Sequence, residues 1–393
     1  MLITGARQVG KSTILENMFP DLFMATFDPE LDILSARKDP ELFLQEHPAP
    51  IILDEIQYVP QLLNVIKRVV DRSEACPQYL MTGSQNLSTL QSVAESLAGR
   101  VTILPLAPMT IYEQLGMTEK PTWLERYLAH PHDLKSYVTG VVPNLSPIRT
   151  IWRGGMPGYL DLPEDLLQDK LQSYVQTYIQ RDVRTLGSVK DLEDFTAFFG
   201  LVAALTAQEI NYEQLGRDLD MAGASAKKWI ALLKQSYQWK DIPAYSGNTI
   251  KRVSSKPKGY FTDTGLACLL QRVPSPEALR SHPLRGALFE TLIVNTIDTI
   301  LSMLPFKAQL YHWRTGGGAE VDLVIAFDNK LYPIEIKMQT NISKYDARGL
   351  AAFRETYAGK GPEVMPGLII YAGTDCYRIE ENTLLLPWHC LVR

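Results

Sequence analysis

A glycine-rich segment near the start of the chain carries the clearest chemistry. It runs Gly-Ala-Arg-Gln-Val-Gly-Lys-Ser from Gly5 to Ser12 and matches the phosphate-binding pattern G-x-x-x-x-G-K-[ST] in full. In such a P-loop, backbone N–H groups surround the phosphates, the lysine reaches the β- and γ-phosphates, and the hydroxyl holds Mg²⁺. The segment therefore predicts that ATP is bound, with Mg²⁺ on the serine, by Gly5, Gln8, Val9, Gly10, Lys11, Ser12 and Thr13.

Two carboxylates, Asp54 and Glu55, directly follow a short apolar run. Downstream of a P-loop, Asp54 is predicted to bind Mg²⁺ through water, and Glu55 to polarise the water that attacks the γ-phosphate. A polar residue after the next apolar run, Ser84 or Gln85, is the candidate sensor of the γ-phosphate. Arg100 is a candidate arginine finger, acting within the chain or in a homo-oligomer; the alternative is a surface arginine at a strand start.

A second acidic group lies in the C-terminal third of the sequence. Two alternating apolar runs flank Asp328-Asn329, which predicts a two-residue hairpin turn. That turn sets a register in which Asp322 falls directly opposite Glu335. Lys337 lies two residues further on and on the same face as Glu335. The hairpin therefore predicts two facing carboxylates beside a lysine.

Such a pair favours a Mg²⁺ site that activates water for phosphodiester attack, because facing carboxylates repel each other without a cation. Glu290, alone on an apolar helical run, is predicted to join them. The set resembles the PD-(D/E)xK nuclease superfamily, which implies a restriction-endonuclease-like α/β domain with Glu290, Asp322 and Glu335 as metal ligands and Lys337 as a catalytic residue. The alternatives are a nuclease-like domain without activity and an exposed charged hairpin.

A basic stretch precedes this region. Helical patterns over Tyr212–Leu219 and Ala224–Gln235 predict a helix-turn-helix, and strands over Trp239–Tyr245 and Ile250–Tyr260 would form a wing around Ser246-Gly247-Asn248. In a chain of net charge -5, a local excess of lysine and arginine is what would contact DNA phosphates. The predicted contacts are Lys227, Lys228, Lys251, Arg252, Lys256 and Lys258. The alternative is a winged helix that makes protein contacts.

Strands and helices must position these residues. Apolar, β-branched runs alternate with helical patterns such as Pro60–Arg72, which predicts a parallel sheet covered on both faces. The expected strands are Met1–Thr4, Phe23–Phe27, Pro50–Ile56, Gln78–Ser84 and Arg100–Leu106. Further on, we expect a helix over Tyr174–Arg184, a linker over Pro274–Pro283 and a helix over Lys344–Tyr357.

Taken together, the motifs resemble a prokaryotic family of AAA-type P-loop ATPases with a C-terminal region called DUF4143. The resemblance rests on the P-loop, Leu-Asp-Glu at 53–55, Thr-Gly-Ser-Gln at 82–85, Leu-Ala-Gly-Arg at 97–100, Gly-Gly-Met-Pro at 154–157, Tyr-Ile-Gln-Arg-Asp at 178–182 and Lys-Gly-Tyr-Phe-Thr-Asp-Thr-Gly at 258–265. It covers nearly the whole chain. It also implies a helical segment before the P-loop strand, which could contact adenine; this sequence begins at the strand itself.

Length and composition set the remaining expectations. A chain of 393 residues with 46% hydrophobic and 21% charged residues is typical of a globular protein with several domains. We expect an ATPase domain at 1–115, a helical extension at 116–186, a winged-helix-like domain at 187–273 and a nuclease-like domain at 280–393. The sequence has no apolar run of the roughly 18 residues that a membrane span needs, and its four cysteines are far apart, as in cytoplasmic proteins.

Two functions remain open from the sequence. The first is an ATPase, dependent on ATP and Mg²⁺, that engages DNA and carries a C-terminal nuclease site. The second is a regulatory ATP switch whose C-terminal half binds a protein partner without catalysis.

Overall fold

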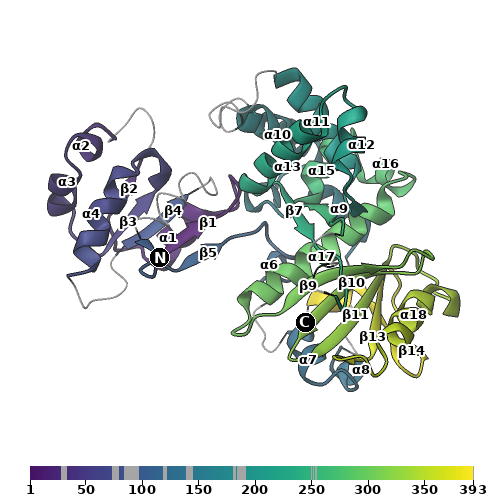
Figure 1. Cartoon of the computed structure of the whole chain (residues 1–393). Helices are drawn as coiled ribbons and strands as arrows, with labels where there is room; N and C mark the ends of the chain where they lie inside the picture. Colours follow the sequence, from purple (N-terminus) through teal and green to yellow (C-terminus); the bar gives the residue numbers. More distant parts are fainter. Residues whose placement is uncertain are drawn as a thin grey trace. The chain divides into compact units, whose positions relative to one another are not determined.

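The computed structural model of the chain describes residues 1–27, 33–72, 79–83, 97–117, 122–138, 145–179, 183, 192–248, 250, 252 and 255–392. The chain divides into two compact units. The first comprises Met1–Pro108 with the short segments Met156–Gly158 and Ile230–Gln238, and the second comprises the rest. Each unit is considered by itself below (Figure 1).

A five-stranded sheet forms the centre of the first unit. Its order is β2-β3-β4-β1-β5, and each neighbouring pair is parallel. The strands are β1 (Leu2–Thr4), β2 (Met24–Thr26), β3 (Ile51–Asp54), β4 (Tyr79–Gly83) and β5 (Ile103–Pro105). All five expected strands are present, each shorter than expected at its ends. The helices are α1 (Lys11–Met18), α2 (Ile33–Lys38), α3 (Pro40–Glu46), η1 (Ile56–Tyr58) and α4 (Gln61–Val70).

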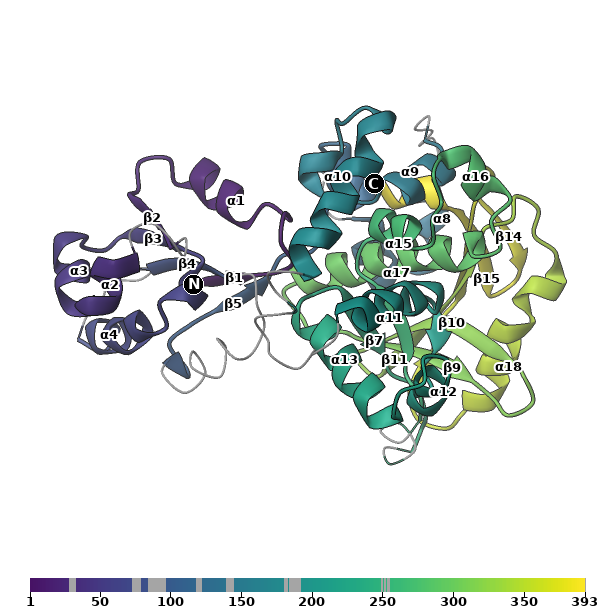
Figure 2. The ribbon, with the colours of Figure 1, turned by 90° about the horizontal axis from the view of Figure 1, so that it is seen from above.

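Alternate residues of these strands face two separate apolar cores. Leu2, Leu53 and Met81 pack in the core that includes residues of α2, α3 and α4. Their neighbours Ile3, Ile52 and Leu80 pack with Leu15 of α1 on the other face. Figure 2 shows α1 on one side of the sheet and α2 to α4 on the other. The inner strands β1, β3 and β4 are buried on both faces, which explains why they are continuous apolar runs. The residues of the edge strand β5 are exposed.

A second, mixed sheet dominates the C-terminal part of the second unit. Its main order is β14-β15-β13-β11-β10-β9, with β12 paired to β11. Strands β9, β10 and β11 are antiparallel neighbours, whereas β13 runs parallel to β11. The strands are β9 (Gln309–Arg314), β10 (Glu320–Phe327), β11 (Lys330–Lys337), β12 (Glu363–Val364), β13 (Gly367–Tyr371), β14 (Tyr377–Glu380) and β15 (Thr383–Pro387).

A small antiparallel sheet of order β6-β8-β7 precedes it, formed by β6 (Gln208–Glu209), β7 (Trp239–Ile242) and β8 (Lys258–Phe261). Of the described residues in the expected strand Ile250–Tyr260, only Lys258, Gly259 and Tyr260 form a strand, so the prediction is wrong for the described residues before Lys258. Asn248 starts a helical turn instead, because its side chain accepts the N–H of Ile250 and its carbonyl accepts the N–H of Arg252. Just after β7, Ala244 bridges His312 of β9, so the two sheets of this unit are joined.

The other elements of the described residues are helices. They are α6 (Ile111–Gln114), α7 (Trp123–Ala129), α8 (Leu134–Val138), α9 (Pro147–Arg153), η2 (Pro157–Tyr159), α10 (Glu164–Tyr178), α11 (Leu192–Ala204), α12 (Tyr212–Arg217), α13 (Gly223–Gln235), α15 (Thr264–Leu270), α16 (Pro276–Arg280), α17 (Arg285–Met303), η4 (Lys344–Ala347), α18 (Arg348–Tyr357) and η5 (Trp388–Val392). The expected helix over Tyr174–Arg184 begins earlier, at Glu164, and α10 ends at Tyr178. Ile179 and Val183 beyond it have π-helical backbone, and residues 180–182 and 184 lie outside the described residues. The expected linker Pro274–Pro283 contains α16, capped by Ser275.

Among the described residues, one helix, α17, is long and apolar enough to cross a membrane by length and composition. More than half of that stretch is buried inside the protein. It also makes polar contacts with β8: the side chain of Asn295 donates to the carbonyl of Phe261 at 2.9 Å. Burial and polar contacts of this kind are those of a core helix.

Candidate functional site

The P-loop connects β1 to α1 through strained backbone. Gly5, Gln8 and Gly10 have positive φ angles of 153°, 64° and 90°. A Cβ on Gly5 would lie 2.3 Å from the carbonyl oxygen of Leu106, so glycine is required there. These angles fold the loop tightly in front of the first turn of α1, where backbone N–H groups favour an anion.

Lys11 opens α1, and its side chain lies over the loop. Its Nζ donates to the carbonyl oxygens of Gly5 at 3.2 Å and Ala6 at 2.8 Å. The side chain is buried, although it carries a charge. Of the other predicted ATP contacts, Val9 is buried, whereas Gln8 and Thr13 are exposed.

Ser12 and Asp54 meet at the carboxyl edge of the parallel sheet. The Oγ of Ser12 donates to Oδ1 of Asp54 at 2.8 Å, although the two residues are far apart in the sequence. A hydroxyl and a carboxylate held together supply the oxygen donors that Mg²⁺ prefers beside phosphates. These two residues therefore fit the predicted Mg²⁺ site.

Thr82, at the end of β4, holds the two acidic residues in place. Its Oγ1 donates to Asp54 and accepts the backbone N–H of Glu55 at 3.0 Å. Glu55 itself has a positive φ of 57°, and its carboxylate accepts a hydrogen bond from the side chain of Gln57. We did not predict Thr82 as a site residue. In the sheet, its strand β4 lies between β1, which leads into the P-loop, and β3, which ends at Asp54.

We expect Thr82→Val to lower ATP turnover about tenfold and to destabilise the first unit by about 1–3 kcal/mol, because valine keeps the volume but leaves Asp54 and the N–H of Glu55 without this partner. Steady-state turnover and urea unfolding followed by circular dichroism measure the two effects. Thr26→Val is the matched control, since Thr26 ends β2, two strands away in the same sheet, with an exposed side chain. Equal loss in both variants would contradict the role of Thr82.

The remaining predicted ATPase residues are less informative. Ser84 and Gln85 lie outside the described residues. Arg100 precedes β5 and forms an ion pair with Asp71, with one nitrogen 3.2 Å from Oδ2. Each of these side chains is more than a third exposed. Because both partners are solvated, that pair is weak enough for Arg100 to leave it.

In the second unit, the predicted hairpin register is confirmed. Leu323 pairs with Ile334 and Phe327 with Lys330, and this register places Asp322 opposite Glu335. The turn residues Asp328 and Asn329 have positive φ angles of 48° and 56°, as a two-residue hairpin turn of type I′ requires. On its other side, β10 pairs with β9 through a register shift between Val321 and Val324, so Asp322 sits at a bulge.

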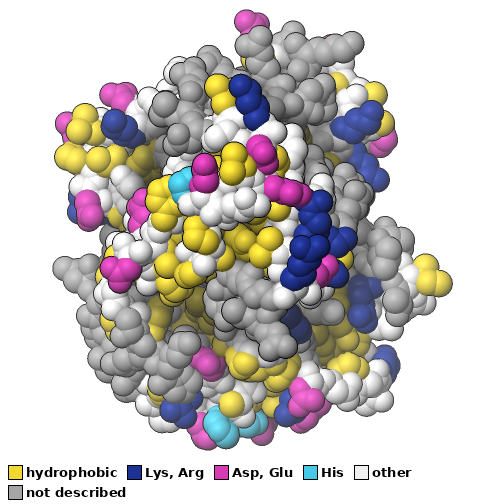
Figure 3. Space-filling view, turned by 90° about the vertical axis from the view of Figure 1, so that its left-hand side faces the viewer, with side chains coloured by type: hydrophobic (Ala, Val, Ile, Leu, Met, Phe, Trp, Pro, Cys, Tyr) yellow, Lys and Arg dark blue, Asp and Glu magenta, His cyan; other side chains and the backbone are white. Residues whose placement is uncertain are grey.

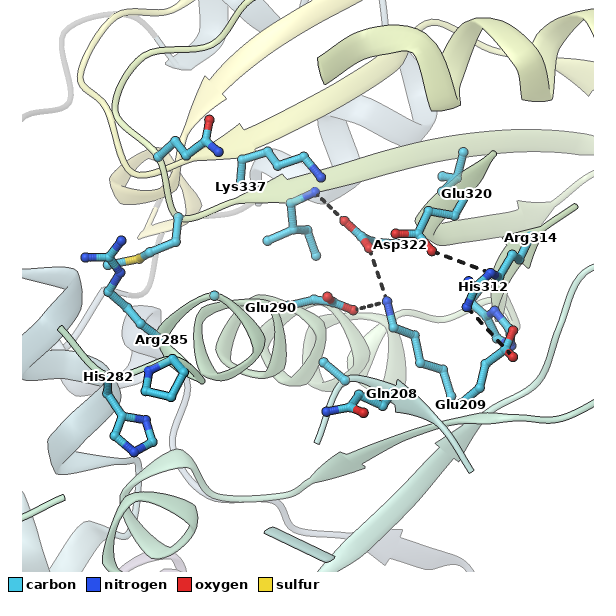
Figure 4. A pocket seen from close by; sticks show the side chains of 18 of the residues that line it. Gln208, Glu209, His282, Arg285, Glu290, His312, Arg314, Glu320, Asp322 and Lys337 are labelled. Carbon is cyan, nitrogen blue, oxygen red and sulfur yellow. Dashed lines mark hydrogen bonds and ion pairs between the residues drawn. The ribbon is translucent and has the colours of Figure 1, made fainter. Parts of the chain in front are cut away.

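Three carboxylates gather at this end of the sheet, but a lysine comes with them. Nζ of Lys258 lies 2.6 Å from Oε1 of Glu290 and 3.1 Å from Oδ1 of Asp322. Figure 4 shows Glu290 from α17 and Asp322 from β10 directed toward this one nitrogen. The hydroxyl of Tyr260 donates to Oε1 of Glu290 at 2.6 Å. The backbone N–H of Ile336 donates to Oδ2 of Asp322 at 2.9 Å.

Glu335 differs from the other two acids in its hydrogen bonding. One of its oxygens pairs with Nζ of Lys337, while Oε2 is buried and has no hydrogen-bond partner among the described residues. Burial and the charge of Asp322 raise the pKa of Glu335 to about 8. Burial, again with Asp322, raises the pKa of Glu290 to about 7. For Asp322, the charges of Lys258 and Lys337 outweigh burial and lower the pKa.

A cavity of about 850 Å³ opens beside this cluster. Basic side chains surround it on opposite sides: Arg285 and His282 lie on one side, and Arg314 and His312 on the other (Figure 4). Lys258, Glu290, Asp322 and Lys337 also line it. The space is large enough for a substrate or a peptide segment to reach the carboxylates.

The acidic cluster does not fit a metal ion as it stands. Between Glu290 and Asp322, the place that a cation would take is held by the ammonium of Lys258. Within the described ranges, no group of three His, Cys, Asp or Glu side chains has an arrangement that could hold a metal. The residues predicted as metal ligands therefore come together, but their charge is balanced by the protein itself.

The predicted DNA contacts divide into three kinds. Lys227 and Lys228 on α13 and Lys256 before β8 are exposed, as the prediction requires. Arg252 is engaged inside the protein, because its guanidinium lies over the rings of Tyr245 and Tyr311 and donates to the carbonyl of Ser246. Lys251 lies outside the described residues.

The prediction that Lys258 belongs to an exposed basic surface is wrong. Its side chain is 13% exposed and carries two ion pairs. The pattern contained a signal for this, since Lys258 and Tyr260 lie two apart on β8 and therefore on one face. An aromatic residue on that face indicates that it is turned inward.

The comparisons with known proteins identify three regions. Residues 1–115 match the family described as AAA domain, residues 146–277 a domain of unknown function (DUF8612), and residues 285–391 a domain of unknown function (DUF4143). The predicted resemblance to an AAA-type ATPase with a C-terminal DUF4143 region is confirmed. The AAA match supports an ATP-binding ATPase.

Two curated relatives align over most of the chain. An uncharacterized protein of Mycobacterium tuberculosis is 28% identical over 339 residues, which are 86% of this chain and 70% of the relative. An uncharacterized protein of Mycobacterium bovis gives the same identity and coverage.

Solved structures match only distantly. A Signal Transduction ATPase with Numerous Domains (STAND) protein with a tetratricopeptide repeat sensor from Pyrococcus horikoshii is 11% identical, with a TM-score of 0.24; the match covers 77% of this chain and 43% of that protein. A protein from Vibrio cholerae is 12% identical with a TM-score of 0.21, over 100% of this chain and 94% of its own. TM-scores this low support no conclusion about the fold.

Proposed function

We propose, since the chain joins an AAA domain to a C-terminal DUF4143 domain, that it is a Mg²⁺-dependent ATPase whose second unit engages DNA. One observation carries the ATPase proposal: the Oγ of Ser12 lies 2.8 Å from Oδ1 of Asp54 at the carboxyl edge of the sheet. Lys11 and Glu55 are the residues next to them in the sequence. That is the arrangement by which a P-loop enzyme positions the γ-phosphate and the attacking water.

Each residue has one task in this proposal. The N–H groups of the P-loop and Nζ of Lys11 bind the phosphates, which releases Lys11 from the carbonyls of Gly5 and Ala6. Ser12 and Asp54 hold Mg²⁺, which neutralises charge that develops on the phosphate oxygens. Glu55 orients the attacking water and accepts its proton, while Thr82 fixes the direction of the Glu55 backbone.

The test is ATP turnover by the purified chain with Mg²⁺, compared with Lys11→Ala and measured with and without duplex DNA. We expect turnover in the wild-type protein, loss of ATP binding in Lys11→Ala, and faster turnover with DNA. Turnover that survives Lys11→Ala unchanged would assign the activity to a contaminant and defeat the proposal.

DNA engagement is supported by the exposed lysines. Lys227 and Lys228 are adjacent on α13, and Lys256 is exposed just before β8. On the face drawn in Figure 3, basic side chains lie next to acidic ones. A mixed surface of that kind is a poor phosphate contact. The lysines that would bind DNA in this proposal are therefore Lys227, Lys228 and Lys256.

We expect the double variant Lys227→Ala/Lys228→Ala to weaken duplex binding and to reduce the slope of log K against log salt by about 1–2, because each lost phosphate contact removes roughly one unit. Fluorescence anisotropy across a salt series measures both. The matched control is Lys170→Ala/Lys360→Ala, two exposed lysines of the same unit. A loss of the same size in the control would show that only net charge matters.

For the acidic cluster, the arrangement favours the second hypothesis from the sequence, a C-terminal half without catalysis in this state. The observation is the pairing of Lys258 with Glu290 and Asp322, which leaves no place between them for a metal. Nuclease activity therefore stays a prediction. A cytoplasmic location and a homo-oligomer belong to the same proposal. In it, Arg100 acts as an arginine finger either within its own chain or on a neighbouring subunit.

A further inference from the structure

Strand β8 delivers two side chains to one carboxylate of the acidic cluster. Lys258 and Tyr260 both contact Oε1 of Glu290, each at 2.6 Å, and both are largely buried. Lys258 also reaches Asp322. The strand lies in the region that matches DUF8612, whereas both carboxylates lie within the region that matches DUF4143.

The strand that carries Lys258 is held firmly in place. The ring of Trp239 lies so close to Gly259 that a Cβ there would be 1.9 Å from it. On the other side, Asn295 of α17 donates to the carbonyls of Phe261 and Thr262. The ammonium of Lys258 is therefore presented to the carboxylates by a rigid element rather than by a loose surface side chain.

Removing the positive charge of Lys258 would change the charge balance of the acidic cluster. Glu290, Asp322 and Glu335 would then face a single remaining ammonium, that of Lys337. Their oxygens would lie buried together, including Oε2 of Glu335, which has no partner within the described part of the chain. Several carboxylate oxygens that converge beside only one ammonium are the donor set that a hard divalent cation prefers.

We propose that Lys258 is the resident cation of this acidic cluster and excludes a divalent cation such as Mg²⁺ or Mn²⁺ from Glu290 and Asp322. The metal site predicted from the sequence is thus present but closed, and it opens only when Lys258 is withdrawn. The inference concerns the second unit and does not depend on ATP hydrolysis. It adds to the nuclease hypothesis the condition under which a metal could enter.

The experiment is Mn²⁺ binding to the full chain, followed by electron paramagnetic resonance in the absence of nucleotide, so that Ser12 and Asp54 give the same background in every variant. Lys258→Met and the less disruptive Lys258→Gln are compared with the wild type. The matched control is Lys240→Met, because Lys240 on β7 pairs with Asp298 on the same helix α17 at 2.6 Å, outside the cluster.

We expect both Lys258 variants to bind Mn²⁺ at least about tenfold more tightly than the wild type, and Lys240→Met to behave as the wild type. Adding Asp322→Asn to Lys258→Gln should abolish the gain. Mn²⁺ should also raise the midpoint of thermal unfolding of the Lys258 variants but not of the wild type, so a poorly folded variant still gives a readout.

Wild-type affinity equal to that of Lys258→Gln, or a gain that survives Asp322→Asn, would overturn the inference. DNA nicking by Lys258→Gln in the presence of Mn²⁺ is measured in a separate assay. Tight Mn²⁺ binding without nicking would reject the nuclease hypothesis and leave the role of Lys258 standing.

Discussion

Glu55→Gln should lower ATP turnover by about 10²- to 10⁴-fold while ATP binding stays within about twofold of the wild type. Glutamine keeps the shape and can still pair with Gln57, but it cannot accept a proton from the attacking water. Asp54, Ser12 and Lys11 are unaffected, so the phosphates and Mg²⁺ remain bound. Single-turnover hydrolysis and equilibrium binding of a fluorescent ATP analogue separate the two quantities.

The control for this substitution is Glu41→Gln in the same unit. Glu41 forms an exposed ion pair with Arg68, away from the P-loop, so its turnover should match that of the wild type. Should Glu55→Gln hydrolyse ATP at the wild-type rate, another group acts as the base. The chain would then still hydrolyse ATP, and Glu55 would have only a structural role.

The stability of the second unit should fall as pH rises from about 5 to about 8. Glu335 and Glu290 have pKa values raised to about 8 and about 7, above their usual value of 4.5. Across that window the folded protein holds protons that the unfolded chain has released, and the stabilisation from that difference is lost as the pH rises. The pKa of Asp322 is lowered, so this residue makes the stability depend on pH only below about pH 4.

Glu335→Gln isolates the contribution of one group. The variant should be more stable than the wild type at pH 8, by on the order of 3 kcal/mol, and similar to it near pH 5. All six tryptophans lie in the second unit, at positions 123, 152, 229, 239, 313 and 388, so tryptophan fluorescence during urea unfolding reports this unit alone.

Glu320→Gln is the matched control, because Glu320 opens the same hairpin with an exposed side chain. It should leave the pH profile unchanged. A flat profile in the wild type, or the same slope in wild type and Glu335→Gln, would show that Glu335 is not held protonated in the folded state.

Much of this architecture could be predicted because its signals are local. The parallel strands are short apolar runs, and the hairpin register follows from the two residues Asp328 and Asn329 that turn it. The meeting of Ser12 with Asp54 follows from a general rule, since the carboxyl ends of parallel strands share one edge of the sheet.

The contacts that escaped prediction are those between elements far apart in the sequence. Lys258 was counted with a basic surface because a charge tally treats every lysine alike and ignores which way β8 faces. Thr82 was passed over for its polar neighbours Ser84 and Gln85, since nothing local shows that a hydroxyl on β4 reaches across to Asp54. The helical turn after Asn248, by contrast, is a local feature. It was missed because Ser246-Gly247-Asn248 was interpreted as the turn of a wing, whereas the side chain of Asn248 accepts the N–H of Ile250.

The bridge between Ala244 and His312 bears on how such proteins can be inherited and engineered. It joins the two sheets on either side of the boundary between the DUF8612 and DUF4143 regions, and the same boundary is crossed by the ion pairs of Lys258. A recombination event that exchanged the last region alone would separate three acids from the lysine that neutralises them. The piece that can pass intact from one protein to another is therefore the pair of regions together.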